Sequence, residues 1–204
     1  MTDDVKRFDR AYFDRWYRSP RHRVATPAEV RRRVLLAVSA AEYVLGRPVR
    51  SVLDVGCGEA SWRAPLLRLR PNLRYQGVDA SEYVVARFGR SRGIRLGSVG
   101  ELGELSLRGN YDVVVCADVL HYLGSQEVER GLEHIASLLG GLAYLPTFTG
   151  ADEVEGDVSA VRQRSPAWYH SRFAAVGLVA LGLDLYLGRS LAATLSALEL
   201  PSGL

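Results

Sequence analysis

Apolar and polar positions along the chain form short blocks whose period changes in a regular order. Short apolar runs predict β-strands, and the amphipathic stretches between them predict α-helices. The fourth apolar run contains three consecutive valines, Val113–Val115, as expected of a strand buried on both faces of a parallel sheet. Strand–helix alternation at this spacing indicates βαβ units with right-handed crossovers. The expected strands are 51–55, 75–78, 94–99, 111–117 and 141–148.

Helix boundary signals are clearest at Thr26. This threonine suits the N-cap, Pro27 suits the first helical position and Glu29 completes a capping box, so a helix should run from here to Leu45 and end at Gly46. Aromatic residues recur every four positions in an earlier helix over 3–18. Further helices are expected over 59–70 (with Pro65 bending it or delaying its start), 81–92, 125–139 and from 165–166 to about 177.

The remaining segments are predicted as follows. Residues 149–164 are polar, acidic and irregular, which indicates a surface loop, and the glycine-rich stretch 100–110 has room for one short helix. Two β-like segments close the chain, Leu178–Leu187 and Leu191–Leu198, and the intervening 188–190 favours an antiparallel hairpin.

Composition indicates a single soluble domain. The chain has 204 residues, of which 48% are hydrophobic and 24% charged. We expect no membrane-spanning segment, since no apolar run is long enough, and no secretory signal, since the charged N-terminus lacks an apolar region. The two cysteines, Cys57 and Cys116, argue against a disulfide framework or a cysteine-based zinc site, so we expect a cytoplasmic location.

Charge is unevenly distributed although the formal net charge is only +3. The first fifty residues carry twelve basic and six acidic side chains, and nearly all the basic ones are arginines. One interpretation is a nucleic-acid docking surface. The other, which we favour, is a solvated helix with internal ion pairs at helical spacing, such as Arg10–Asp14 and Asp14–Arg18.

A glycine turn follows the first expected strand. Gly56 permits a tight turn and Gly58 allows a ligand to approach the backbone closely. Asp79 ends the next strand, 21 residues after Gly58, where a carboxylate can accept hydrogen bonds from both hydroxyls of a ribose. We therefore expect an adenosine-containing cofactor across the strand ends. The simpler alternative is that Asp54 and Asp79 only cap the helices that follow them.

The charges beside the turn discriminate between adenosine cofactors. A dinucleotide places its pyrophosphate at a helix N-terminus. Here Asp54 and Glu59 flank the turn, and Ser61 replaces the third glycine of the dinucleotide fingerprint. Two carboxylates should repel a pyrophosphate and favour S-adenosylmethionine, which has an ammonium group and a sulfonium but no phosphate.

At these residues the chain resembles the class I S-adenosylmethionine-dependent methyltransferases, particularly small bacterial ones. The resemblance covers roughly residues 50–187. It implies a doubly wound, Rossmann-like α/β fold whose seven strands have the order 3-2-1-4-5-7-6, mostly parallel with one antiparallel strand, and helices on both faces. We expect one structural domain that divides into an N-terminal helical extension over 1–48, which either closes over the pocket as a lid or buries its aromatic side against the sheet, and a cofactor-binding part over 49–204.

The resemblance implies specific cofactor residues. The turn would hold the methionine part, Asp79 the ribose, the loop after the third strand the adenine, and the end of the fourth strand would lie beside the methyl group. The two cysteines are otherwise expected to be small buried residues. The implied cofactor residues are Asp54, Gly56, Cys57, Gly58, Asp79, Ala80, Ser98, Val99, Ala117 and Asp118.

Methyl transfer from a sulfonium is an in-line displacement that needs a base only when the acceptor must lose a proton. Candidate catalytic residues are His121, Tyr122 and His170, with packing or capping as the alternative role; Asp118 more readily orients the cofactor or a turn. Candidate substrate-binding residues are aromatic and lie on the first helix and on the helix after the acidic loop: Tyr12, Trp16, Tyr17, Trp168 and Tyr169.

Several classes of methyltransferase are disfavoured. The fourth strand does not end in an Asn/Asp-Pro-Pro-aromatic motif, there is no Pro-Cys pair for covalent catalysis, and no acidic cluster suggests a metal site. We therefore expect a small-molecule methyl acceptor, of cationic or sugar-like character if the acidic loop contributes. Two alternatives stay open: an RNA methyltransferase that docks through arginines such as those at 31–33, and a non-catalytic protein that binds S-adenosylmethionine.

Overall fold

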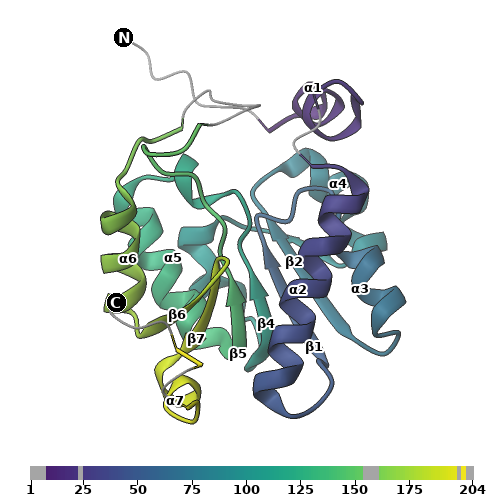
Figure 1. The fold of residues 1–204 in the computed structure, drawn as a ribbon. Helices are drawn as coiled ribbons and strands as arrows, with labels where there is room; N and C mark the ends of the chain where they lie inside the picture. Colours follow the sequence, from purple (N-terminus) through teal and green to yellow (C-terminus); the bar gives the residue numbers. More distant parts are fainter. Residues whose placement is uncertain (1–7, 23–24, 154–160, 197–198, 201–204) are drawn as a thin grey trace.

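The computed structural model describes residues 8–22, 25–153, 161–196 and 199–200, and a seven-stranded sheet lies at its centre. The strand order is β3-β2-β1-β4-β5-β7-β6, and β7 runs antiparallel to both of its neighbours while the other pairs are parallel. This confirms the predicted fold class and topology (Figure 1). The strands are β1 Ser51–Val55, β2 Arg74–Asp79, β3 Ile94–Leu96, β4 Tyr111–Val115, β5 Leu139–Tyr144, β6 Leu178–Gly182 and β7 Leu185–Gly188.

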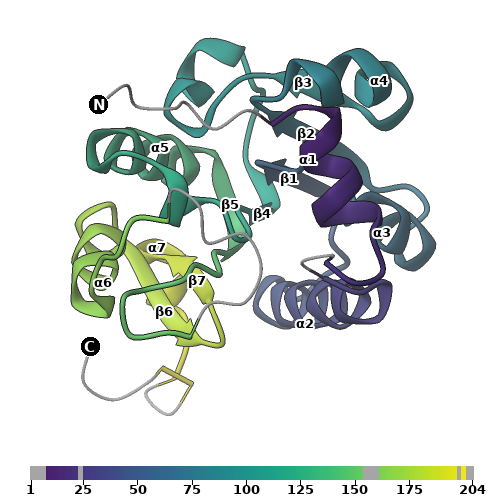
Figure 2. The same ribbon diagram turned by 90° about the horizontal axis from the view of Figure 1, so that it is seen from above.

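Helices cover both faces of the sheet, and a short N-terminal segment lies across the strand ends (Figures 1 and 2). The α-helices are α1 Arg10–Phe13, α2 Pro27–Leu45, α3 Arg63–Leu69, α4 Glu82–Arg92, α5 Ser125–Leu138, α6 Pro166–Ala175 and α7 Arg189–Ala192. Three helical segments of other types are the π-helix η1 Asp14–Arg18 and the 3-10 helices η2 Val99–Leu105 and η3 Leu120–Tyr122.

The core has two layers because successive side chains of a strand point to opposite faces. On β1, Val52 packs with α2 and α3, whereas Leu53 and Val55 pack with η2, α5 and α6. All three side chains are fully buried. Burial on both faces explains the continuous apolar runs in the sequence.

Local signals fixed several boundaries. The predicted capping box forms at Thr26, whose hydroxyl accepts the Glu29 N–H at 3.2 Å, and α2 ends at Gly46 in the left-handed conformation. Helix α3 begins only at Arg63, consistent with the delayed start that Pro65 indicated. The third strand is shorter than predicted, because its last residues lead into the η2 segment, which has its own capping box at Ser98.

The closing hairpin differs from the prediction. The chain reverses at Leu183 and Asp184, both with positive φ (53° and 60°), and not at 188–190. Positive φ at both central residues is the geometry of a type I′ turn, whose twist matches that of the flanking strands. The expected strand over 191–198 is also wrong, because α7 occupies its start. The prediction failed since Leu-Asp is not a recognised turn signal.

Candidate functional site

A cavity of about 790 Å³ lies at the carboxyl ends of the parallel strands, within the range of about 300–1,000 Å³ that is typical of small-molecule sites. The glycine turn and the ends of β2 and β4 form its floor, and α2 and α3 form one wall. The N-terminal segment with α1 and η1 covers it (Figure 2). Predicted site residues that line it are Tyr12, Trp16, Tyr17, Asp54, Gly56, Cys57, Asp79, Ala80, Ser98, Val99, Ala117, Asp118, His121 and Tyr122.

The glycine turn adopts the conformation that its residues predicted. Gly56 and Gly58 have φ of 67° and 51°, in the region where a side chain is strained. The N–H of Gly56 donates to the Val78 carbonyl at 2.8 Å, which anchors the turn to β2. A Cβ atom on Gly56 would lie 2.5 Å from the Val119 side chain, so a glycine is also required for packing.

Asp79 connects the turn to the start of α4. One carboxylate oxygen accepts the Gly58 N–H at 2.7 Å and the other accepts the Ser81 N–H at 2.9 Å. Ser81, not Asp79, is the N-cap of α4, because its hydroxyl accepts the Val84 N–H. Burial raises the pKa of Asp79, and the two backbone N–H groups oppose that effect. The carboxylate is therefore held in a fixed position at the cavity wall.

Asp54 is a buried acid at the end of β1, with only 3% of its surface exposed. Its pKa is raised to about 7: burial is the main cause, the Tyr75 O–H, which donates to Asp54 at 2.7 Å, opposes it, and the nearby Asp79 adds to it. In the described ranges neither Asp54 nor Asp79 forms an ion pair. Both acids would consequently be stabilised in the ionised form by a cationic ligand group.

Tyr17, on η1, lies directly over the glycine turn. A Cβ atom built on Gly58 would be 2.5 Å from the Tyr17 hydroxyl and 2.9 Å from two ring carbons. Burial is the main cause that raises the pKa of Tyr17 well above its usual value, and Tyr12 and Asp79 add to it. The N-terminal segment thus closes the cavity with an aromatic ring at van der Waals distance from the turn.

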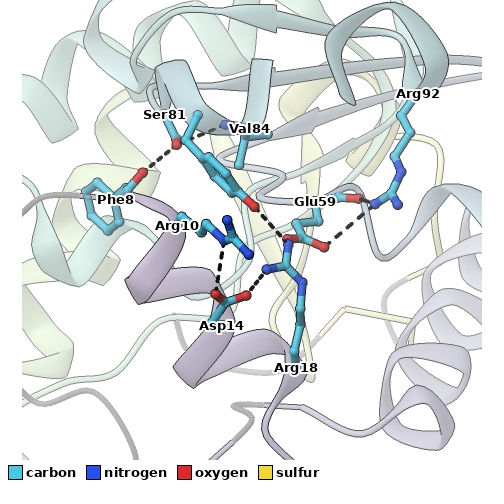
Figure 3. Close-up of polar contacts among 9 residues, drawn as sticks. Phe8, Arg10, Asp14, Arg18, Glu59, Ser81, Val84 and Arg92 are labelled. Atoms are coloured by element: carbon cyan, nitrogen blue, oxygen red, sulfur yellow. Dashed lines mark hydrogen bonds and ion pairs between the residues drawn. The ribbon is translucent and has the colours of Figure 1, made fainter. Parts of the chain in front are cut away.

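Polar contacts attach this segment to the domain, as Figure 3 shows. Arg18 binds Asp14 of its own helix, Glu59 after the glycine turn, and the hydroxyl of Tyr83. At the other end of the segment, the Ser81 hydroxyl donates to the Phe8 carbonyl at 2.5 Å. These contacts join the segment to the turn and to α4.

Glu59 does not contribute negative charge to the cavity as the sequence suggested. This carboxylate pairs with Arg18 and lies 3.9 Å from Arg92, so arginines compensate its charge, and it does not line the cavity. The negative charge that the cavity presents beside the turn therefore belongs to Asp54 and Asp79.

Asp118, just after β4, has a left-handed backbone with φ of 58°. This conformation is unusual for a residue with a side chain, and non-glycine residues of this kind concentrate at functional sites. Its N–H donates to the Pro146 carbonyl at 2.9 Å, and its carboxylate pairs with Arg33 of α2 at 2.7 Å. Both side chains line the cavity and are about one-third exposed.

His121 is fully buried at the far side of the cavity. Its ring packs against Tyr122 and Phe148, with centroids 4.2 and 5.0 Å away. The Phe148 N–H points to Nδ1 at 3.4 Å, so that nitrogen acts as an acceptor. The Arg162 N–H donates to the His121 carbonyl at 2.8 Å, which positions the loop segment that precedes α6. Packing is thus one clear role of this histidine.

The structure does not bring the predicted residues of α6 to the cavity. Tyr169 is 2% exposed and belongs to the core under α5, Trp168 packs edge-on against it, and His170 is exposed to solvent. The helix faces the core because Tyr169 and Phe173 lie four residues apart on its apolar side. Gly58 also lies outside the cavity lining, although a Cβ atom built on it would meet the Tyr17 ring.

Several cavity residues were missed by sequence reasoning. They come from helix faces and loops that the fold turns toward the cavity. One of them is Arg33, which the sequence analysis considered only as part of the arginine run 31–33. A polar residue beside the apolar positions Val30 and Val34 was the available signal. The additional lining residues include Arg33, Trp62, Arg68, Glu127, Phe148 and Arg162.

The described residues also bear on metal binding, membrane insertion and thiol chemistry. They contain no cluster of three or more His, Cys, Asp or Glu side chains able to hold a metal ion, and no helix of the length and apolarity needed to cross a membrane. Both cysteines are buried as free thiols, and burial raises the pKa of each. A high thiol pKa disfavours the nucleophilic thiolate.

Comparisons with known proteins agree with this geometry. Residues 53–141 match the methyltransferase domain family, and no curated protein matches the chain. Magnesium protoporphyrin IX methyltransferase from Synechocystis PCC 6803, solved with bound S-adenosylmethionine, is 20% identical with a TM-score of 0.57, over 89% of this chain and 93% of that one. A sugar N-methyltransferase from Streptoalloteichus sp ATCC 53650 is 20% identical with a TM-score of 0.57, over 81% and 87%.

A third solved structure is larger than this chain. An O-methyltransferase family protein from Burkholderia thailandensis is 21% identical with a TM-score of 0.53, and the match covers 79% of this chain but only 57% of that protein. At such identities the likeness to all three structures concerns the fold.

Proposed function

We propose that the chain is a class I S-adenosylmethionine-dependent methyltransferase that transfers a methyl group directly to a small-molecule acceptor, and the match of residues 53–141 to the methyltransferase domain family supports this. The observation that supports this best is the covered cavity at the strand ends, whose floor holds two buried carboxylates beside a glycine turn. The reaction is an in-line displacement on the methyl carbon.

The residues present fit the methyl donor. S-adenosylmethionine supplies an electrophilic methyl on a sulfonium, an ammonium group and a ribose. We assign the ammonium end to Asp54 and the turn at Gly56–Gly58, and the ribose to Asp79. Asp54 is suited to a cation because it is buried and forms no ion pair within the described residues. Ser98 and Val99, which line the cavity after β3, are assigned to the adenine.

Catalysis would rest mainly on positioning, since the sulfonium leaving group needs no protonation. Tyr122 and Asp118 line the cavity near the end of β4 and can orient the acceptor or receive its proton. Arg33 supports this arrangement by holding the Asp118 carboxylate in place. His121 contributes through packing at the cavity wall, whereas His170 is exposed on α6 and does not line the cavity, so we assign it no role as a base.

A small acceptor fits the covered shape of the cavity. The N-terminal extension, proposed to span 1–48, would act as a lid through Tyr12, Trp16 and Tyr17, while 49–204 carries the cofactor. Closing such a lid excludes water from the transferring methyl group and admits only molecules that the cavity can hold. A folded RNA would have to present a single flipped base to enter.

The RNA alternative still has one supporting observation. Arg31 and Arg32 are exposed on α2, although Arg33 points into the cavity and pairs with Asp118. Neutralising Arg31 and Arg32 together, while leaving Arg33 intact, therefore tests docking without disturbing the site. Salt-sensitive RNA binding that is lost in this double variant would favour the alternative.

Calorimetry and labelled-methyl transfer test the proposal. We expect S-adenosylmethionine and S-adenosylhomocysteine to bind and NAD not to bind, and label to enter the small-molecule fraction of a cell extract and not its RNA. Asp54→Asn should weaken cofactor binding and lower label transfer with it, whereas the control variant Glu104→Gln, at an exposed position, should change neither. Binding of NAD, or cofactor binding with no transfer to any pool, would contradict the proposed activity; the second result would favour a non-catalytic binding protein.

A further inference from the structure

The charged residues that line the cavity fall into two groups. Asp54 and Asp79 lie at the glycine turn, and Glu127 packs against Gly100 in the loop region assigned to the adenine. These acids belong to the cofactor side. The other charged residues of the lining are Asp118 and three arginines.

The arginines are not equivalent. Arg33 is neutralised by Asp118 at 2.7 Å. Arg68 of α3 and Arg162 of the segment before α6 also line the cavity, and neither forms an ion pair with any residue in the described parts of the chain. Among the described residues, the cavity lining therefore contains two arginine side chains without an acidic partner.

Aromatic rings also line the cavity. Trp62 is 5% exposed and packs against Tyr144 with ring centroids 5.4 Å apart, so its face is fixed. Trp16 of η1 and Phe148 after β5 line the cavity from the covering segment and from the opposite side. Rigid rings of this kind bind flat apolar molecules at a low entropy cost.

We propose that the methyl acceptor is a flat, largely apolar molecule that carries a carboxylate, and that Arg68 and Arg162 recognise this group. The inference rests on the proposed function, because the proposed function assigns the part of the cavity around Asp54 and Asp79 to the cofactor. Guanidinium groups match carboxylates in geometry as well as charge. The acidic loop over 149–164 places no carboxylate at the cavity among its described residues. Asp152 and Glu153 do not line the cavity, and the Asp152 carboxylate accepts hydrogen bonds from Thr149. Glu155 and Asp157 lie outside the described residues.

Three probes with the same ring separate charge from shape. They are 3-hydroxybenzoate, 3-hydroxybenzamide and 3-hydroxybenzylamine, titrated by calorimetry up to about 10 mM into protein saturated with S-adenosylhomocysteine. We expect the anionic probe to bind at least about tenfold more tightly than the neutral one, and the cationic probe to bind most weakly. Added salt should weaken the anion's binding.

Two variants and a matched control locate the effect. Arg68→Gln and Arg162→Gln should each weaken 3-hydroxybenzoate binding about three- to tenfold. Arg63→Gln on the same helix α3, which does not line the cavity, should leave it unchanged. S-adenosylhomocysteine affinity should be the same in all three.

Each other outcome is informative. Equal binding of the three probes, preferred binding of the amine, or no binding of any probe to the S-adenosylhomocysteine complex would overturn the proposed acceptor class while leaving the proposed methyltransferase activity intact. If Arg63→Gln weakened 3-hydroxybenzoate binding as much as the other two variants, the effect would be one of long-range charge only, and the assignment of the carboxylate to Arg68 and Arg162 would be overturned. Failure of S-adenosylhomocysteine itself to bind would instead contradict the proposed function.

Discussion

Replacing Gly58 with alanine tests whether the N-terminal segment closes over the glycine turn. Gly58 has φ of 51°, a conformation that costs an alanine about 1–2 kcal/mol. Its new methyl group would also lie 2.5 Å from the Tyr17 hydroxyl, so the ring must move, at a further cost of about 1–3 kcal/mol. Gly58→Ala should therefore destabilise the protein by about 2–5 kcal/mol.

The chain provides a matched control in Gly46. It has φ of 62°, yet a Cβ atom there would meet nothing within 4 Å. Gly46→Ala should cost only the backbone strain of about 1–2 kcal/mol and leave cofactor affinity unchanged. Urea unfolding followed by circular dichroism gives the free energy of unfolding of each variant, and calorimetry gives the affinity for S-adenosylmethionine.

A double-mutant cycle with Tyr17→Ala isolates the contact. Once the ring is removed, Gly58→Ala should cost no more than Gly46→Ala, so the two substitutions should be less than additive by about 1–3 kcal/mol. Strict additivity, or equal costs for the two glycine variants in the wild-type background, would refute the docked position of Tyr17.

The remaining predictions concern the carboxylates that line the cavity: Asp54, Asp79 and Asp118 with its partner Arg33. The pKa of Asp54 is raised to about 7, mainly by burial, and a bound ammonium group would stabilise the ionised form. Calorimetry should therefore show the cofactor affinity falling as the pH drops below 7, by at most about tenfold per unit of pH. Asp54→Asn should bind the cofactor weakly, and its affinity should depend less on pH. In the cofactor-free protein the raised pKa has the opposite effect: the stability that Asp54 contributes is full below its unfolded value of 3.8 and is lost as the pH rises through about 7. Asp79→Ala should weaken cofactor binding by about 1–3 kcal/mol, the value of lost hydrogen bonds to a ribose, and wild-type affinity in a folded variant would mean that the ribose is misplaced. Arg33→Gln leaves Asp118 without its ion-pair partner and should lower the free energy of unfolding by about 1 kcal/mol. Arg31→Gln, at an exposed position, is the control and should lower it by less than about 0.5 kcal/mol. Equal losses in urea unfolding would argue against a structural role for the pair.

Local sequence signals predicted much of this fold because they act over a few residues. The capping box at Thr26 and Glu29 and the stop at Gly46 set the limits of α2 without help from the rest of the chain. The continuous valines of β4 required burial on both faces and so a parallel sheet. The type I′ turn at Leu183 and Asp184 escaped prediction because the pairing of β6 with β7, and not the preference of these two residues, imposes the conformation.

The candidate site divides in the same way. The sequence by itself determined the proposed cofactor side, since the glycines and Asp54 act through backbone geometry and charge within one turn, and Asp79 follows at the end of the next strand. Only the tertiary structure decided the proposed acceptor side, where Arg33 and Arg68 come from different helices and Arg33 meets Asp118 after β4. Which face a helix turns toward a cavity depends on packing against the whole sheet, and for that reason α6 buried Tyr169 while α2 and α3 supplied the arginines.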